Sequence, residues 1–184
     1  MNPDARIPGF PAPGASFEAP LEMLVACHGR IERQCAILLR LVTHLAAHGA
    51  DVQAQTAAAN VLRYFDTAAL QHHADEEADL FPALLESMAG SDAVCIREIT
   101  ERLSGEHRLL EAAWRRLREP LEKIAGGEVT ALDAAQVESF TRAYADHLAF
   151  EEAELLPMAA RLLGDAEIEA IGRAMRERRG IGAA

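Results

Sequence analysis

Apolar side chains recur at intervals of three and four residues along most of the 184-residue chain, which is the spacing of one face of an α-helix. The pattern forms four long segments, separated by short breaks rich in Gly, Asp or Ser, with expected ranges 17–48, 52–89, 92–125 and 130–163. Sustained alternation of polar and apolar positions, which would indicate a half-buried strand, does not occur. The sequence therefore predicts an all-α fold.

The short breaks between the segments also predict how the helices are arranged. Short connections force consecutive helices to lie antiparallel, so we expect an up-down-up-down four-helix bundle over residues 17–164. The first 20 residues contain five prolines, and we interpret residues 1–16 as an extended arm. Residues 165–184 predict a short fifth helix that runs to about Arg178, with Asp165 as its N-cap, and a tail.

An internal repeat relates the second and fourth segments. HHADEEADLFP at residues 72–82 returns as HLAFEEAELLP at residues 147–157. The matching pairs at this offset are Phe65/Phe140, Ala68/Ala143, His72/His147, Ala74/Ala149, Glu76/Glu151, Glu77/Glu152, Leu80/Leu155 and Pro82/Pro157. The first and third segments match more faintly, through His28/His107, Glu32/Glu111 and Leu38/Leu117. The repeat predicts two related helical hairpins, with one histidine of each helix at a common level.

The spacing of these residues is typical of metal ligands. A histidine and a glutamate four positions later lie about 40° apart on a helical wheel, so both side chains can reach one point. Imidazole and carboxylate together suit iron, zinc or manganese, and a carboxylate can bridge two ions. The candidate ligands for a two-metal site are His28, His72, Glu76, His107, His147 and Glu151.

Neighbouring polar residues leave some choices open. Glu77 and Glu152 stand five positions after a histidine, about 140° round the wheel, and are expected outside the coordination sphere. His73 is about 100° off the line of ligands and is an alternative to His72. Glu32 and Glu111, one turn after a histidine, are interpreted as solvated or as neighbours of the ligands. Pro82 and Pro157 are expected to kink the ends of their helices.

Composition narrows the class of protein. The net charge is −11, from 29 acidic and 18 basic residues, which disfavours a nucleic-acid partner. Three cysteines, Cys27, Cys35 and Cys95, form no CxxC pair and suit reduced thiols. The chain has neither a run of about 20 apolar residues nor a basic, apolar leader, so we expect no membrane partner and a cytoplasmic location.

The doubled His-x-x-x-Glu-Glu-x-x-Leu-(Phe/Leu)-Pro motif, with His28 in the first segment and Glu106-His107 in the third, resembles the hemerythrin-like (HHE cation-binding) proteins. The resemblance covers about residues 17–163. It implies an antiparallel four-helix bundle that holds a non-haem di-iron centre, bridged by two carboxylates and an oxo or hydroxo group. Zinc or manganese could substitute for iron. The ligands that the resemblance carries over are His28, His72, Glu76, His107, His147 and Glu151.

The resemblance also bears on function. Glu111 and Glu152 stand where the oxygen-carrying hemerythrins have a second histidine and an aspartate, which argues against reversible oxygen carriage. We expect a protein that binds a small ligand such as oxygen or nitric oxide, or that handles iron, as a sensor, scavenger or store. The alternatives are a di-iron enzyme that reduces nitric oxide or peroxide or repairs iron–sulfur centres, and a bundle with structural zinc. A ferritin-like oxidase is disfavoured because the chain contains no Glu-x-x-His.

Overall fold

The computed structural model describes residues 16–87, 92–129 and 131–182, and all regular elements in these ranges are helical. The predicted all-α class is therefore confirmed, whereas the expected extended arm lies almost wholly outside the described residues. In chain order the elements are α1 (Pro20–His48), α2 (Val52–Phe65), α3 (Ala68–Asp75), the π-helical segment η1 (Glu76–Leu80), α4 (Phe81–Glu86), α5 (Asp92–Ala125), α6 (Ala134–Phe150), the π-helical segment η2 (Glu151–Leu155), α7 (Leu156–Leu162) and α8 (Asp165–Arg178).

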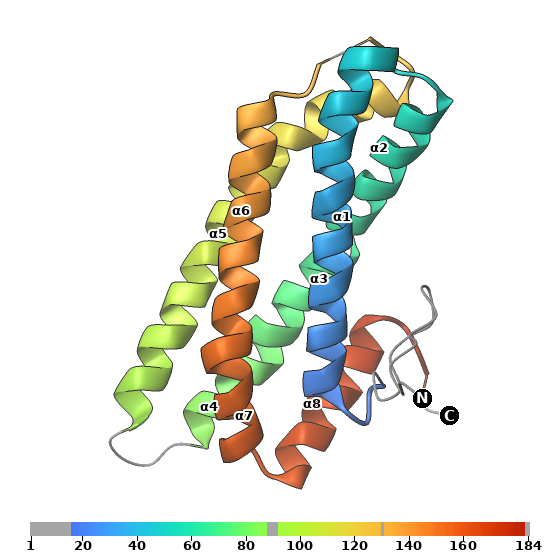
Figure 1. The fold of residues 1–184 in the computed structure, drawn as a ribbon. Coiled ribbons are helices and arrows are strands. Elements are labelled where there is room, and N and C mark those ends of the chain that lie inside the picture. Colours follow the sequence, from blue (N-terminus) through green and yellow to red (C-terminus); the bar gives the residue numbers. More distant parts are fainter. Residues whose placement is uncertain (1–15, 88–91, 130, 183–184) are drawn as a thin grey trace, which may run out of the picture.

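Four long helical stretches lie side by side (Figure 1). They are α1, the run from α2 to α4, α5, and the run from α6 to α7. α1 packs against α2 and α6, and α5 packs against the same two helices, so the contacts close into a ring. The up-down-up-down order of a four-helix bundle stays a prediction. α8 lies beside one end of the ring, in contact with α1, α3 and η1 (Figure 1).

Local signals place the helix ends. Pro20 stands in the first turn of α1, where its missing N–H costs nothing, and Gly49 ends that helix with φ +67°. The carboxylate of Asp51 accepts a hydrogen bond from the N–H of Ala54 at 2.9 Å and caps α2.

The start of α8 differs from the expectation. The residue at its N-cap is Gly164, and Asp165 is the first helical residue. The Glu167 carboxylate accepts a hydrogen bond from the N–H of Gly164 at 3.1 Å, so a side chain inside the helix satisfies the terminal N–H. Asp165 remains favourable there because an acidic side chain in the first turn complements the helix dipole.

The helical runs that carry the repeat change from α- to π-helix at the same place in both copies. The N–H of Phe81 bonds the carbonyl of Glu76, five residues back, and the N–H of Leu156 bonds the carbonyl of Glu151. The α-helix that follows each π-helical segment, α4 or α7, has a proline as its second residue. Single π-helical turns are frequent at functional sites. The kinks expected at Pro82 and Pro157 stay a prediction.

Two apolar clusters fill the interior, one on each side of a polar layer. One cluster contains Ile31, Phe65, Trp114 and Phe140, and the other contains Leu24, Leu84, Leu103 and Met175 among others. In the first three long stretches the candidate ligands fall between residues of the two clusters. In the fourth, Glu151 does so, and His147 stands directly before Leu148, the last residue of the first cluster in that stretch. The candidate site is therefore a polar layer within an otherwise apolar core.

Candidate metal centre

Seven side chains of the polar layer are almost completely buried, each at most 4 % exposed. They are His28 from α1, His72 and His73 from α3, Glu76 from η1, His107 from α5, His147 from α6 and Glu151 from η2. The six candidate ligands from the sequence are all among them. Buried carboxylates are costly unless a positive charge compensates them, so this layer requires cationic partners.

The seven side chains form adjoining groups of donor atoms. His28, His72, Glu76 and Glu151 each offer one donor atom, and these atoms lie within 4.8 Å of one another. Glu76 and Glu151 join His107 and His147 in a second such group, and His73 lies equally close to the same two histidines. The two carboxylates are thus common to both groups, as bridging ligands would be.

Many of these buried polar atoms have no hydrogen-bond partner among the described residues. They are Nε2 of His28, both ring nitrogens of His72, Nδ1 of His73 and all four carboxylate oxygens of Glu76 and Glu151. The nearest pairs are close without hydrogen-bond alignment: His147 Nε2 lies 2.8 Å and His28 Nε2 3.2 Å from oxygens of Glu151. Buried polar atoms are normally satisfied, so converging nitrogen and oxygen lone pairs fit bound first-row metal ions.

A second shell of carboxylates orients three of the histidines. Nδ1–H of His28 donates to Glu152 at 2.8 Å, and Nδ1–H of His107 donates to Glu77 at 2.7 Å. Nδ1–H of His147 donates to Glu106 at 2.8 Å. A carboxylate can only accept, so each contact places a proton on Nδ1 and turns Nε2 toward the centre, where Nε2 of His107 and Nε2 of His147 lie 3.1 Å apart.

These contacts give Glu77 and Glu152 a definite place. Both lie outside the donor groups, as the wheel analysis expected, and each supports a histidine of another helix. The part played by Glu106 was missed by the sequence analysis, although the residue stands beside His107. Glu106 bonds His147 instead of its neighbour, and that contact depends on how α5 and α6 pack.

The site includes both histidines of the His72-His73 pair. The His72 ring meets the His28 ring edge-on, with centroids 5.1 Å apart, whereas the His73 ring stacks on His107 at 4.0 Å. The Tyr144 hydroxyl lies 3.4 Å from Nε2 of His73. The donor groups contain His72 in one case and His73 in another, so the choice between the two residues as ligands stays a prediction. In the sequence, His73 differs from His72 in that it has no matching histidine in the second copy of the repeat, so the repeat did not indicate a place for it in the site.

Burial and mutual contact shift the pKa values of this layer in opposite directions. Burial lowers the pKa of His72 to about 3 and holds that of His73 well below its usual value, so both rings are neutral and keep free lone pairs. Burial and the nearby Glu151 raise the pKa of Glu76 to about 7. Burial opposes the charge of His107, but the carboxylates of Glu151 and Glu76 outweigh it and raise its pKa to about 10.

The remaining candidates lie outside the donor groups. Glu32 is exposed and Glu111 is half-buried, in agreement with the interpretation of both as neighbours or solvated residues. The thiols of Cys27 and Cys35 are buried, and Cys95 is exposed.

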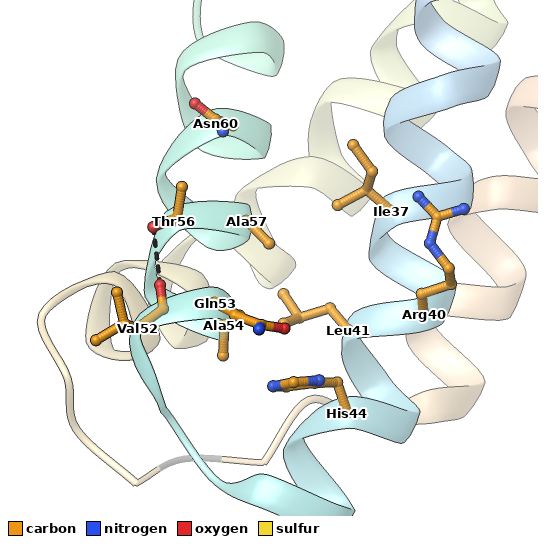
Figure 2. Close-up of a pocket in the computed structure, with 10 residues that line it drawn as sticks. All are labelled: Ile37, Arg40, Leu41, His44, Val52, Gln53, Ala54, Thr56, Ala57 and Asn60. Carbon is orange, nitrogen blue, oxygen red and sulfur yellow. Dashed lines mark hydrogen bonds between the residues drawn. The ribbon is translucent and has the colours of Figure 1, made fainter.

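Two surface pockets lie beside the polar layer. One of about 590 Å³ lies between the C-terminal half of α1 and the start of α2, lined by Leu41, His44 and Val52 among others (Figure 2). None of the seven donors lines it. A pocket of about 450 Å³ between α1 and α6 comes nearer, because Tyr144 is among its lining residues and its hydroxyl reaches His73.

Within the described ranges, none of the helices combines the length and the apolar character that crossing a membrane requires.

Comparison with known proteins agrees with the chemistry of this layer. Residues 19–159 match the family model of the hemerythrin HHE cation binding domain. The chain is also 32 % identical over 167 residues to a protein of Haemophilus influenzae named only as uncharacterized, and the match covers 91 % of this chain and 94 % of the relative. The chain belongs to the hemerythrin HHE cation-binding domain family.

Proposed function

We propose that the chain holds two iron ions in the polar layer and uses them to bind a small ligand such as oxygen or nitric oxide, or to handle iron. The observation that carries this proposal is the set of six buried donors in two groups that share Glu76 and Glu151, with His73 close to two of the histidines. Two carboxylates common to both groups suit a pair of metal ions better than a single structural zinc ion, which usually takes four tetrahedral ligands.

The donor groups suggest which residues hold each ion. His28 and His72, with the two shared carboxylates, form one set, and His73, His107 and His147 supply imidazoles to the other. When bound, the iron pair would supply redox-active ions able to accept a small diatomic ligand. The chain itself orients the imidazoles through Glu77, Glu106 and Glu152 and surrounds the layer with apolar side chains.

His73 bears on oxygen carriage. The ligands predicted from the sequence include four imidazoles, fewer than in the oxygen carriers, because Glu111 replaces a histidine of the third helix. His73 reaches His107 from the second helix instead, which restores a fifth imidazole to the layer. Nitrogen ligands carry less negative charge than carboxylates and stabilise the ferric state less. The lifetime of an oxygen adduct is therefore the property that separates a carrier from a sensor or an iron-handling protein.

The test begins with metal analysis of protein purified with iron available. We expect close to two irons per chain and near-ultraviolet charge-transfer absorption after oxidation. His28→Ala should lose iron, whereas His48→Ala, on the exposed end of the same helix, should keep both ions. One tightly held zinc ion without such absorption would contradict the proposal and favour the structural alternative. Mixing the diferrous protein with oxygen in a stopped-flow spectrometer then measures whether an adduct is stable or autoxidises.

A further inference from the structure

A buried acidic residue adjoins the bridging carboxylate Glu76. Asp75, the last residue of α3, is 0 % exposed, yet it belongs to neither donor group. Its carboxylate bonds two arginines that follow one another at the end of α8. Arg179 donates to Asp75 at 2.6 and 3.1 Å, and Arg178 donates to the same carboxylate.

One of the two arginines, Arg178, also contacts the π-helical segment. Arg178 donates to Asp79 of η1 at 2.6 Å, so one guanidinium group spans the residues on both sides of Glu76. Among the side chains described, Arg178 and Arg179 are the cations within salt-bridge distance of Asp75. We call Asp75, Asp79, Arg178 and Arg179 the α8 clamp.

The clamp breaks the internal repeat. Phe150 is the residue that corresponds to Asp75 in the fourth stretch, and the guanidinium group of Arg102 covers its ring at 3.6 Å from the centroid. The chain thus places an arginine over each position that precedes a bridging glutamate. In the fourth stretch the arginine comes from the bundle itself, whereas in the second stretch it comes from α8, which lies beyond the family match at residues 19–159.

We propose that Arg178 and Arg179 are positioning residues that hold η1, and with it Glu76, against the metal layer and so slow the loss of metal. This inference rests on the proposed function. Without the two arginines, a buried carboxylate beside Glu76 lacks its counter-charge, and an uncompensated buried charge is strongly destabilising. A shift of this segment toward water would relieve it. Movement of Asp75 would displace Glu76 as well, because the two residues are adjacent in the chain.

α8 keeps a separate anchor that allows the clamp to be tested without unfolding the helix. Ile171 and Met175 are buried in the apolar cluster on that side of the layer, and the backbone of Gly172 passes close to the carbonyl of Phe17. Replacing only the guanidinium groups leaves these contacts in place.

The experiment uses the full chain loaded with cobalt(II), whose visible d–d bands report the ligand geometry. Release of cobalt to an excess of chromogenic chelator is followed in the wild type and in the Arg178→Gln/Arg179→Gln variant. We expect release about tenfold faster, as for residues that support metal ligands, together with altered d–d bands. Arg173→Gln, which removes an exposed pair with Glu169 on the same helix, should match the wild type. Arg178→Lys/Arg179→Lys should restore part of the retention, because the charge is kept.

A double-mutant cycle identifies the carboxylate through which the arginines act. Asp75→Asn removes the buried charge, so adding Arg178→Gln/Arg179→Gln to it should accelerate release little further. If the arginine substitutions have their full effect in the Asp75→Asn background, or no effect in the wild type, the clamp proposal is overturned. Failure of the wild type to bind cobalt would overturn the metal centre and the clamp together. A wild type that binds cobalt, with unchanged release from the arginine variant, would overturn the clamp alone. Hydrogen exchange of the Glu76–Leu80 amides in metal-free protein supplies an independent readout, and equal protection in all variants would count against the clamp.

Discussion

Two adjacent glutamates, Glu76 and Glu77, provide the sharpest test of the metal centre. Glu76 is 0 % exposed, and its oxygens belong to both donor groups. Glu77 faces away from these groups, and its carboxylate accepts the Nδ1–H of His107 at 2.7 Å and bonds Arg108. Glu76→Ala should therefore remove a ligand of both ions, whereas Glu77→Ala should only loosen one histidine.

The structure sets the size of the difference. Loss of a residue that orients a metal ligand typically weakens metal binding 10- to 100-fold, or about 1.4 to 2.8 kcal/mol. The Glu77 side chain is 28 % exposed, so water can take over part of its hydrogen bonding to His107. We therefore expect Glu77→Ala to weaken metal binding about tenfold, at the low end of this range, and Glu76→Ala to weaken it more than 100-fold.

Competition with a chromogenic chelator measures the affinities, and metal analysis measures the stoichiometry. In excess iron, Glu77→Ala should still bind close to two ions, whereas Glu76→Ala should lose the paired site. Glu151→Ala and Glu152→Ala should repeat this contrast, and Glu154→Ala serves as the control because its side chain is exposed on the same π-helical segment. Equal losses from both members of a doublet would refute the division into bridging and orienting carboxylates.

Three further predictions concern His73, the pH dependence of metal binding and the effect of metal removal on stability. His73→Ala should lower the stoichiometry toward one ion, because the first donor group does not need it, and full retention of two ions would exclude a ligand role. Metal must displace protons from His107, whose pKa is raised to about 10, and from Glu76, raised to about 7. Apparent affinity should therefore fall as the pH drops from 8 to 6, with proton release seen by calorimetry in two buffers, and pH-independent binding would contradict this. Free metal at 100 times its Kd should add about 2.7 kcal/mol of stability, or about 5–11 °C in Tm, lost on chelation; an unchanged Tm would show that the native layer binds no metal.

Local periodicity was sufficient to predict the helices and most of the donors. Spacings of three and four residues repeat the helical turn, so the ranges of the helices follow from neighbouring residues alone. The common level expected for His28, His72, His107 and His147 came from the internal repeats. The offset of 75 residues identified Glu76 and Glu151 in the same way, because equivalent places in two similar helices meet the same environment.

Contacts between distant parts of the chain decided the rest. The supporting bond from His28 to Glu152 joins residues 124 apart, and the clamp from Arg179 to Asp75 joins residues 104 apart. The π-helical turns depart from the ideal helical wheel on which a prediction from sequence is based. In the preceding α-helix, both histidines of the His72-His73 pair reach donor groups. A wheel gives the direction of a side chain from its own helix, but what it meets there depends on how the helices pack. The sequence therefore determined which residues could bind metal, and the tertiary structure decided which residues support them.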